Sequence, residues 1–232
     1  MLHLVGLDGA GPLAGHNLWG GPTYVDPDRG YVELADHGQI RHDGWVGDLG
    51  DGFTEELTWL DPTGKELVRE VRTIAINGDK TALRIDFRSE LTSATGAPVT
   101  LATPAQYGRS DGGYGGLFLR LSTEFVLDKA RAQSNNDDDS QEGATPGTAP
   151  APAVSGLVAA AFIVSGRIGD ERVTLTFLDG PGGTVPPSRW LFRFGDYSAV
   201  CWAAAYERQL IVPQSGSLVF SHQLEIATHP AT

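Results

Sequence analysis

The stretch FTEELTWLDPTGKELVREVRTIAINGDKTALRIDFRSEL, residues 53–91, decides the fold of this chain. In Asp61-Pro62-Thr63-Gly64, proline fixes the φ angle at the second turn position and glycine supplies a permissive position after it. Asn77-Gly78 is the strongest short hairpin signal that a sequence can carry. These two turns separate three strand-like segments, which are residues 53–60, 66–76 and 81–91. The stretch therefore predicts an antiparallel meander.

The third of these segments shows the most regular alternation. Leu83, Ile85 and Phe87 share one face, and the arginines Arg84 and Arg88 lie on the other. A period of two residues over this length predicts a strand with one buried face and one solvated face. Such strands are typical of antiparallel sheets that cover a core from one side.

The rest of the chain continues in the same style, with glycine- and proline-rich turns and no amphipathic helix or fixed repeat. The apolar run at 157–165 predicts a strand buried on both faces, and the phase of the last strand turns His222 toward the core. With about twelve short strands in all, we predict an all-β fold, either an antiparallel β-sandwich or a distorted barrel.

One domain covering residues 1–232 is expected, because all-β domains reach this length as single units. Its one compositional break is the acidic, proline- and alanine-rich sequence SNNDDDSQEGATPGTAPAPA. Such a sequence cannot bury enough apolar surface to offset the entropy lost on ordering. We therefore predict a disordered loop over residues 129–155, within the single domain.

Composition limits the partners and the compartment. A net charge of -12 and a pI near 4.8 argue against nucleic acid and anionic membranes as partners. Cys201, the single cysteine, rules out an internal disulfide and is expected to be a buried, inert thiol. No run reaches the roughly 18 apolar residues of a membrane helix, and the N-terminus lacks a secretory signal. A cytoplasmic protein without metal or cofactor is the prediction.

The first candidate group is a histidine pair. His37 and His42 are five positions apart and would face opposite ways on one straight strand. We assign proton transfer to one of them, as a catalytic acid or base. Alternatively, the histidines ligate a metal ion together with a neighbouring aspartate, or they are ordinary residues of turns and solvated strand positions.

The second candidate group centres on YGRSDGGYGGLFLRL, residues 107–121. Here Arg109, Asp111 and Tyr114 crowd beside closely spaced glycines, and we assign them to substrate binding. Trp19 beside Gly20-Gly21 offers a platform for a sugar face, and His16 completes the binding set. The alternative is an Asp-Gly-Gly turn held by an arginine–carboxylate pair.

The segments HNLWGGPTYV, HGQIRHDGW and YGRSDGGYGGLFLR together resemble the bacterial PmoA-like family, labelled "methane oxygenase PmoA". The resemblance implies a soluble, mutarotase-like super-sandwich that binds, and in one reading processes, a carbohydrate or sugar derivative. Family members carry an upstream histidine-rich segment similar to DHPWH, which this chain is expected to lack. The resemblance leaves open a non-catalytic assembly module pairing through a sheet edge, including a homo-oligomer, and a metal-dependent oxygenase.

Overall fold

The computed structural model describes residues 2–3, 16–48, 50–109, 112–113, 115–133, 154–185, 189–193 and 198–230. These residues form antiparallel strands joined by turns, with one short 3-10 helix, η1, at Pro104–Tyr107. No helix in these ranges is long and apolar enough to cross a membrane. The predicted all-β fold is confirmed.

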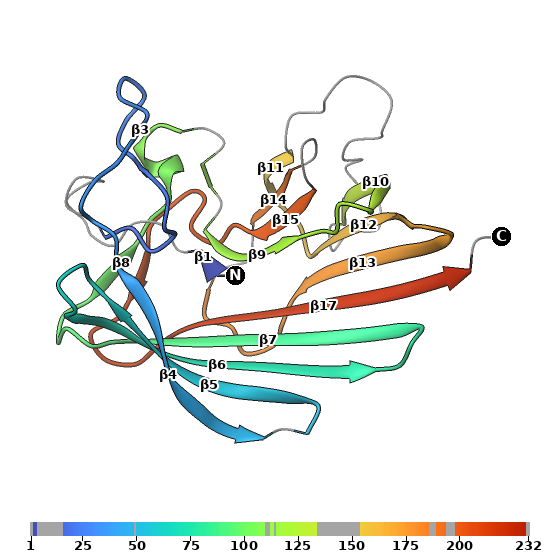
Figure 1. The fold of residues 1–232 in the computed structure, drawn as a ribbon, viewed down its shortest axis with the longest axis horizontal. Helices are drawn as coiled ribbons and strands as arrows, with labels where there is room; N and C mark the ends of the chain where they lie inside the picture. The colour runs from blue at the N-terminus through green and yellow to red at the C-terminus, as the bar shows by residue number, and fades with distance from the viewer. Residues whose placement is uncertain are drawn as a thin grey trace.

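The larger sheet has eight strands in the order β10-β12-β13-β17-β7-β6-β5-β4 (Figure 1). Its strands are β4 (Gln39–Asp48), β5 (Gly52–Leu60), β6 (Glu66–Gly78), β7 (Ala82–Ser93), β10 (Val126–Gln133), β12 (Ala161–Ile168), β13 (Glu171–Asp179) and β17 (Leu218–Pro230). Strands β5 to β7 are the predicted meander. The C-terminal strand β17 then pairs with both β7 and β13, so it joins the two halves of the sheet.

Aspartate side chains fasten both turns of the meander. Asp61 Oδ1 accepts hydrogen bonds from the main-chain N–H of Thr63 and Lys65. In the next hairpin the strand continues through Gly78, and Asp79 Oδ1 accepts from the N–H of Thr81 at 2.8 Å. The turn therefore lies just after the Asn-Gly pair that predicts it, because the aspartate holds the reversal.

The smaller sheet has five strands in the order β1-β9-β15-β14-β11, and two short pairs, β16-β8 and β2-β3, complete the fold. Their bounds are β1 (Leu2–His3), β2 (Thr23–Tyr24), β3 (Tyr31–Val32), β8 (Val99–Leu101), β9 (Gly116–Arg120), β11 (Val154–Val158), β14 (Arg189–Arg193), β15 (Ala199–Trp202) and β16 (Leu210–Val212). Figure 1 shows β9, β14 and β15 over the β12–β13–β17 part of the larger sheet. The architecture is a sandwich.

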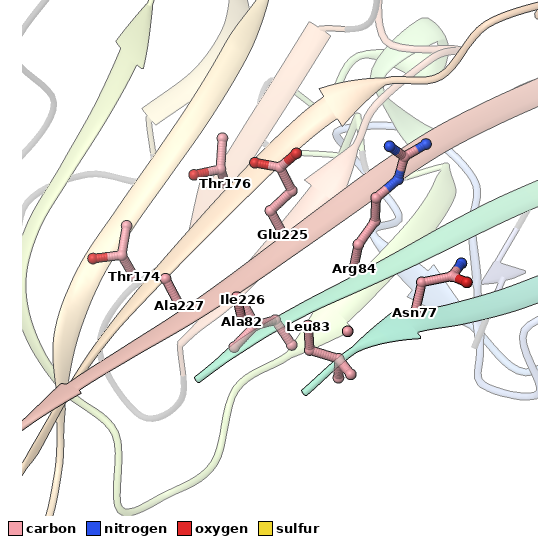
Figure 2. A pocket seen from close by; sticks show the side chains of 10 residues that line it. Asn77, Ala82, Leu83, Arg84, Thr174, Thr176, Glu225, Ile226 and Ala227 are labelled. Atoms are coloured by element: carbon pink, nitrogen blue, oxygen red, sulfur yellow. The ribbon is translucent and has the colours of Figure 1, made fainter. Parts of the chain in front are cut away.

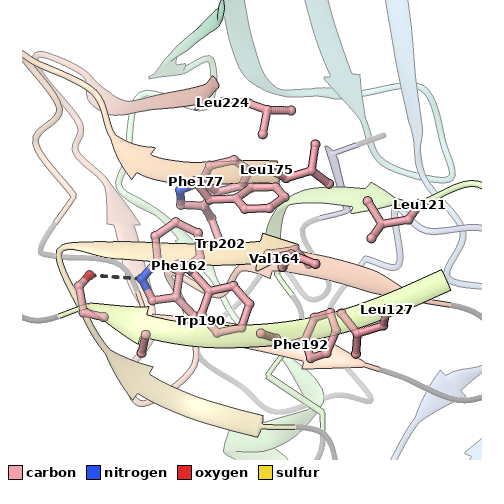
Figure 3. Packing of buried hydrophobic residues seen from close by; sticks show 14 of the residues in the cluster. Leu121, Leu127, Phe162, Val164, Leu175, Phe177, Trp190, Phe192, Trp202 and Leu224 are labelled. Atoms are coloured by element: carbon pink, nitrogen blue, oxygen red, sulfur yellow. Dashed lines mark hydrogen bonds between the residues drawn. The ribbon is translucent and has the colours of Figure 1, made fainter. Parts of the chain in front are cut away.

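Aromatic residues from both sheets fill the space between them. Trp190 and Trp202 from the smaller sheet pack against Phe162 and Phe177 from the larger one, with ring centroids 5.1 to 6.2 Å apart (Figure 3). Trp190 Nε1 donates to the carbonyl of Ala159 at 3.0 Å, so the buried indole is satisfied. This cluster fixes the two sheets face to face.

Two sequence-based boundaries are wrong. The run at 157–165 is not one strand: β11 ends at Val158 in the smaller sheet and β12 begins at Ala161 in the larger one. The chain crosses between the sheets there, and the buried part of the run begins at Ala159, since Val158 is 58% exposed. The loop expected at 129–155 also overlaps with β10, since Ala130 and Ala132 are buried opposite Val164 and Phe162. Residues 134–153 lie outside the described part of the chain.

Candidate functional site

A chain of ionisable side chains crosses the inner face of the larger sheet, which is the face turned toward the smaller sheet. Arg72 on β6 donates from Nε to Glu70 at 2.8 Å and from Nη1 to Glu55 on β5 at 3.2 Å. Glu55 in turn accepts from Nδ1 of His42 on β4 at 3.0 Å. Cross-strand register places Glu55 opposite Arg72, so three neighbouring strands build this charged row.

Glu70 anchors the buried end of the charged row. Its side chain is 0% exposed, and besides Arg72 it accepts from Trp59 Nε1 at 2.9 Å and Ser89 Oγ at 2.7 Å. A carboxylate is very costly to bury unless it is paired and hydrogen-bonded. Here both oxygens have donors, so Glu70 holds Arg72 rigidly.

The solvent end of the row is aromatic. Trp45, with 65% of its surface exposed, lies 4.7 Å from the ring of His42 and 5.1 Å from that of Phe53. The bond from His42 Nδ1 to Glu55 fixes the imidazole and leaves Nε2 as the nitrogen available to a ligand. An exposed indole therefore lies beside an oriented histidine.

A pocket of about 220 Å³ continues from the charged row into the space between the sheets. Arg72 belongs to its lining, together with apolar side chains and two polar aromatic residues, His222 and Trp202. The lining residues are Arg72, Ile74, Ile85, Phe87, Leu117, Phe118, Leu119, Trp202, His222, Gln223 and Leu224. Side-chain exposure falls from 41% at His42 to 18% at Arg72 and 3% at His222, which orders the site from solvent to interior.

The interior end of the pocket is polar but poorly bonded. In the described structure, Nε2 of His222 and Nε1 of Trp202 have no hydrogen-bond partner, and Nδ1 of His222 has only a long contact with Asp179. Burial lowers the pKa of His222, while Asp179, whose Oδ1 lies 3.6 Å from Nδ1, opposes that shift. The prediction that His222 faces the core is confirmed.

His37, the other predicted catalytic histidine, fastens a loop. Its Nδ1 lies 3.1 Å from the carbonyl oxygen of Leu34 and its Nε2 lies 3.0 Å from that of Gly21. Both ring nitrogens therefore face main-chain acceptors. The catalytic assignment of His37 stays a prediction, but the contacts describe a residue that closes the 21–34 segment.

The structure brings two predicted binding residues together around Tyr31. The guanidinium of Arg109 lies 5.0 Å from the Tyr31 ring centroid, and its Nη1 hydrogen-bonds to the Tyr31 hydroxyl. Trp19 packs edge-on to the same ring at 6.3 Å. His16 lies apart, near Asp61, whose pKa is lowered mainly by the Thr63 hydroxyl and to a small extent by the charge of His16. Arg109, Trp19 and Tyr31 therefore form one group, and the contacts described for His42 involve other residues.

The remaining predicted residues, Asp111 and Tyr114, lie outside the described part of the chain. Neighbouring glycines have a packing reason. A Cβ at Gly113 would lie 1.7 Å from the Tyr206 ring, and one at Gly116, where φ is +142°, would lie 2.1 Å from the Trp202 carbonyl oxygen. Close approach of backbone and ring thus explains these two glycines of the stretch without a ligand.

A second pocket, of about 350 Å³, lies over the outer face of the larger sheet (Figure 2). Its polar side chains include Arg84 on β7, Glu225 on β17 and Thr176 on β13, which are cross-strand neighbours. Arg84 is bonded to Asp86 on its own strand at 2.9 to 3.0 Å. This pocket holds solvated, paired groups and lacks the buried unbonded nitrogens of the inner pocket.

Two further predictions concern thiol and metal chemistry. Cys201 is buried as expected, and burial raises its pKa to about 12, so the thiol is protonated at neutral pH. Within the residues that the structure describes, no group of three or more His, Cys, Asp or Glu side chains could hold a metal ion.

A family model matches residues 7–232, which is nearly the whole chain. The chain belongs to DUF6807, a family of unknown function. Similar solved structures include a variant of the GH36 α-galactosidase AgaA from Geobacillus stearothermophilus in complex with 1-deoxygalactonojirimycin (TM-score 0.48, 8% identity, 87% of this chain and 28% of that one). A putative aldose 1-epimerase from Escherichia coli K12 gives a TM-score of 0.42 at 9% identity, over 99% of this chain and 82% of that one. Curated proteins give no match.

The chain thus spans little more than a quarter of the galactosidase that it resembles. Sequence reasoning missed the site residues Glu55 and Trp202, and it also missed the β6 pair of Glu70 and Arg72. A signal for them exists, because they occupy the inward phase of β6 between Val68 and Ile74, where apolar residues are expected. Two charges in the buried phase of a strand indicate a buried polar network.

Proposed function

We propose that this DUF6807 protein binds a small carbohydrate or sugar derivative on the inner face of the larger sheet, and that His42 is its proton-transfer residue. The observation that carries the proposal is the row His42–Glu55–Arg72–Glu70, which leads from an exposed tryptophan into a pocket. Ligand sites of this kind combine mostly apolar walls with a few fixed polar groups. The earlier resemblance to the PmoA-like family stays a prediction.

The geometry assigns a role to each member of the row. Glu55 accepts the Nδ1 proton of His42, which leaves the Nε2 lone pair to accept a proton from a sugar hydroxyl. Arg72 is a positioning residue that holds Glu55 in place, and Glu70 holds Arg72. Trp45 offers a flat apolar surface for the C–H face of a sugar ring.

The rival proposal, an assembly module that pairs through a sheet edge, has one observation in its favour. The edge strand β4 exposes Trp45 and Val46. However, its pairing with β5 is interrupted by bulges after His42 and after Trp45. Bulges twist an edge and hinder the addition of another strand, so the ligand proposal fits β4 better.

Binding of a monosaccharide panel at millimolar concentration, followed by ligand-observed NMR and calorimetry, tests the proposal. We expect at least one monosaccharide to bind and Trp45→Ala to weaken that binding at least tenfold. Val46→Ala is the matched control, since Val46 is exposed on the same strand and is expected to leave binding unchanged. Absence of binding by every sugar, or equal binding by Trp45→Ala and wild type, refutes the proposal.

A further inference from the structure

We infer that His222 and Trp202 form the interior end of the ligand site and that they select an uncharged sugar, one of whose hydroxyl groups enters between the two sheets. The inference rests on the proposed function, because it concerns the same site. It adds that the ligand is uncharged, and it adds two binding residues, of which the sequence indicated only that His222 faces the core.

The first observation is the pair of buried rings. His222 is 3% exposed and Trp202 is 1% exposed, and their ring centroids are 4.7 Å apart. In the described protein, Nε2 of His222 and Nε1 of Trp202 have no hydrogen-bond partner, and Nδ1 of His222 has only a long contact of 3.6 Å with Asp179. Buried polar atoms in native proteins are almost always bonded. Two such exceptions on neighbouring residues that line one pocket indicate that a molecule entering the pocket supplies the partners.

The chemistry of these atoms fits a hydroxyl group. The indole N–H only donates, whereas a neutral imidazole has one donor and one acceptor nitrogen. A hydroxyl group both donates and accepts, so it can bond to both rings. The walls around them are apolar, with Ile85 and Phe87 on one sheet and Leu117 and Leu119 on the other. Such walls match the C–H faces of a sugar ring.

The charge of the pocket excludes an anionic ligand. Arg72 is the one arginine or lysine among the described residues that line the pocket, and it is bonded to both Glu55 and Glu70. Two carboxylates therefore face one guanidinium. A phosphate or carboxylate would enter without a free cation, and burying an unpaired charge is costly. Asp179 near His222 adds a further negative charge.

Calorimetric titration with D-glucose, D-galactose, D-glucose 6-phosphate and D-glucuronic acid tests the ligand class. We expect at least one neutral hexose to bind and both anionic sugars to bind at least tenfold more weakly. His222→Phe and Trp202→Phe are each expected to weaken hexose binding at least tenfold. His222→Gln, which keeps a donor and an acceptor, is expected to retain part of it.

Nitrogen NMR of the His222 ring in the wild-type protein gives a readout that does not depend on a variant folding. We expect the ring nitrogen signals to shift when the bound hexose saturates the site. If the hexose binds and depends on Trp45, but the His222 signals and His222→Phe affinity stay unchanged, water alone occupies the interior end and the inference is wrong. Equal binding of the anionic sugars also overturns it. If none of the four sugars binds, the proposed function fails together with it.

Discussion

Replacing Glu70 by alanine is expected to lower the free energy of unfolding by about 3–5 kcal/mol, the range for breaking a buried ion pair. The carboxylate accepts from Trp59, Ser89 and Arg72, and its side chain is fully buried. The bonds that Trp59 and Ser89 donate to the carboxylate are charge-assisted, and the loss of such a bond costs roughly 1.5–3 kcal/mol. The guanidinium keeps Glu55 as a partner at 3.2 Å, which places the expected loss toward the lower end of the range.

Urea unfolding followed by tryptophan fluorescence measures this loss, with the slope of the transition checking that two-state behaviour persists. Glu66→Ala is the control, because Glu66 pairs with Arg69 in an exposed contact that contributes at most about 1 kcal/mol. Glu70→Gln keeps the shape of the side chain but removes the charge, so an intermediate loss is expected. A Glu70→Ala protein within about 1 kcal/mol of wild type would refute the argument that the buried row supports the fold.

Other outcomes follow from single buried positions. Burial lowers the pKa of His222 in the folded state, and Asp179 opposes that shift. As pH falls below about 6.5, the imidazole of His222 is therefore protonated in the unfolded chain before it is protonated in the folded protein. Stability should then fall by at most about 1.4 kcal/mol per pH unit as pH drops toward the folded-state pKa, as urea midpoints can show, and His222→Phe should remove this contribution. The same variant should raise stability at pH 7 by about 1 kcal/mol, because it deletes the unbonded Nε2 and an Nδ1 whose contact with Asp179 is 3.6 Å long. Gly113→Ala should cost about 1–3 kcal/mol through its clash with Tyr206, measured against Gly44→Ala, where a Cβ meets nothing. Cys201 should resist iodoacetamide at pH 8 until the protein is unfolded, as followed by mass spectrometry.

Local chemistry predicted the hairpins but not the sheets. Proline and glycine at 61–64 and Asn-Gly at 77–78 act over a few residues, so their effect is visible in the sequence. The insertion of β17 between β7 and β13 depends on contacts between distant segments. A continuous apolar run such as 157–165 also does not reveal that its two parts belong to different sheets, since residue type carries no mark of the crossing at 159–160.

In the candidate site, too, residue types are visible in the sequence, whereas the contacts between them depend on the fold. His42 was singled out by residue type, but its partner Glu55 lies on the next strand and is set by register. His37 was singled out equally, and its contacts with two carbonyl groups depend on a loop that no periodicity describes. Arg109 was singled out by residue type as well, and its contact with the Tyr31 ring, far away in the sequence, is set by the fold. Residue types thus identified participants, and only the fold identified partners.

Glu70 and His222 are buried polar side chains on the same sheet face, and they differ in how far their polar atoms are hydrogen-bonded. Glu70 has donors for both carboxylate oxygens, so its burial supports the structure. Among the described residues, His222 has only a long 3.6 Å contact with Asp179 at Nδ1 and no partner at Nε2, so its burial costs free energy that these contacts recover only in part. Both lie in a face whose other inward residues are largely apolar, and phenylalanine or leucine would pack there without that cost. A stability argument accounts for Glu70, whereas His222 requires a ligand-based one, which makes the interior end of the pocket the more informative place to look for function.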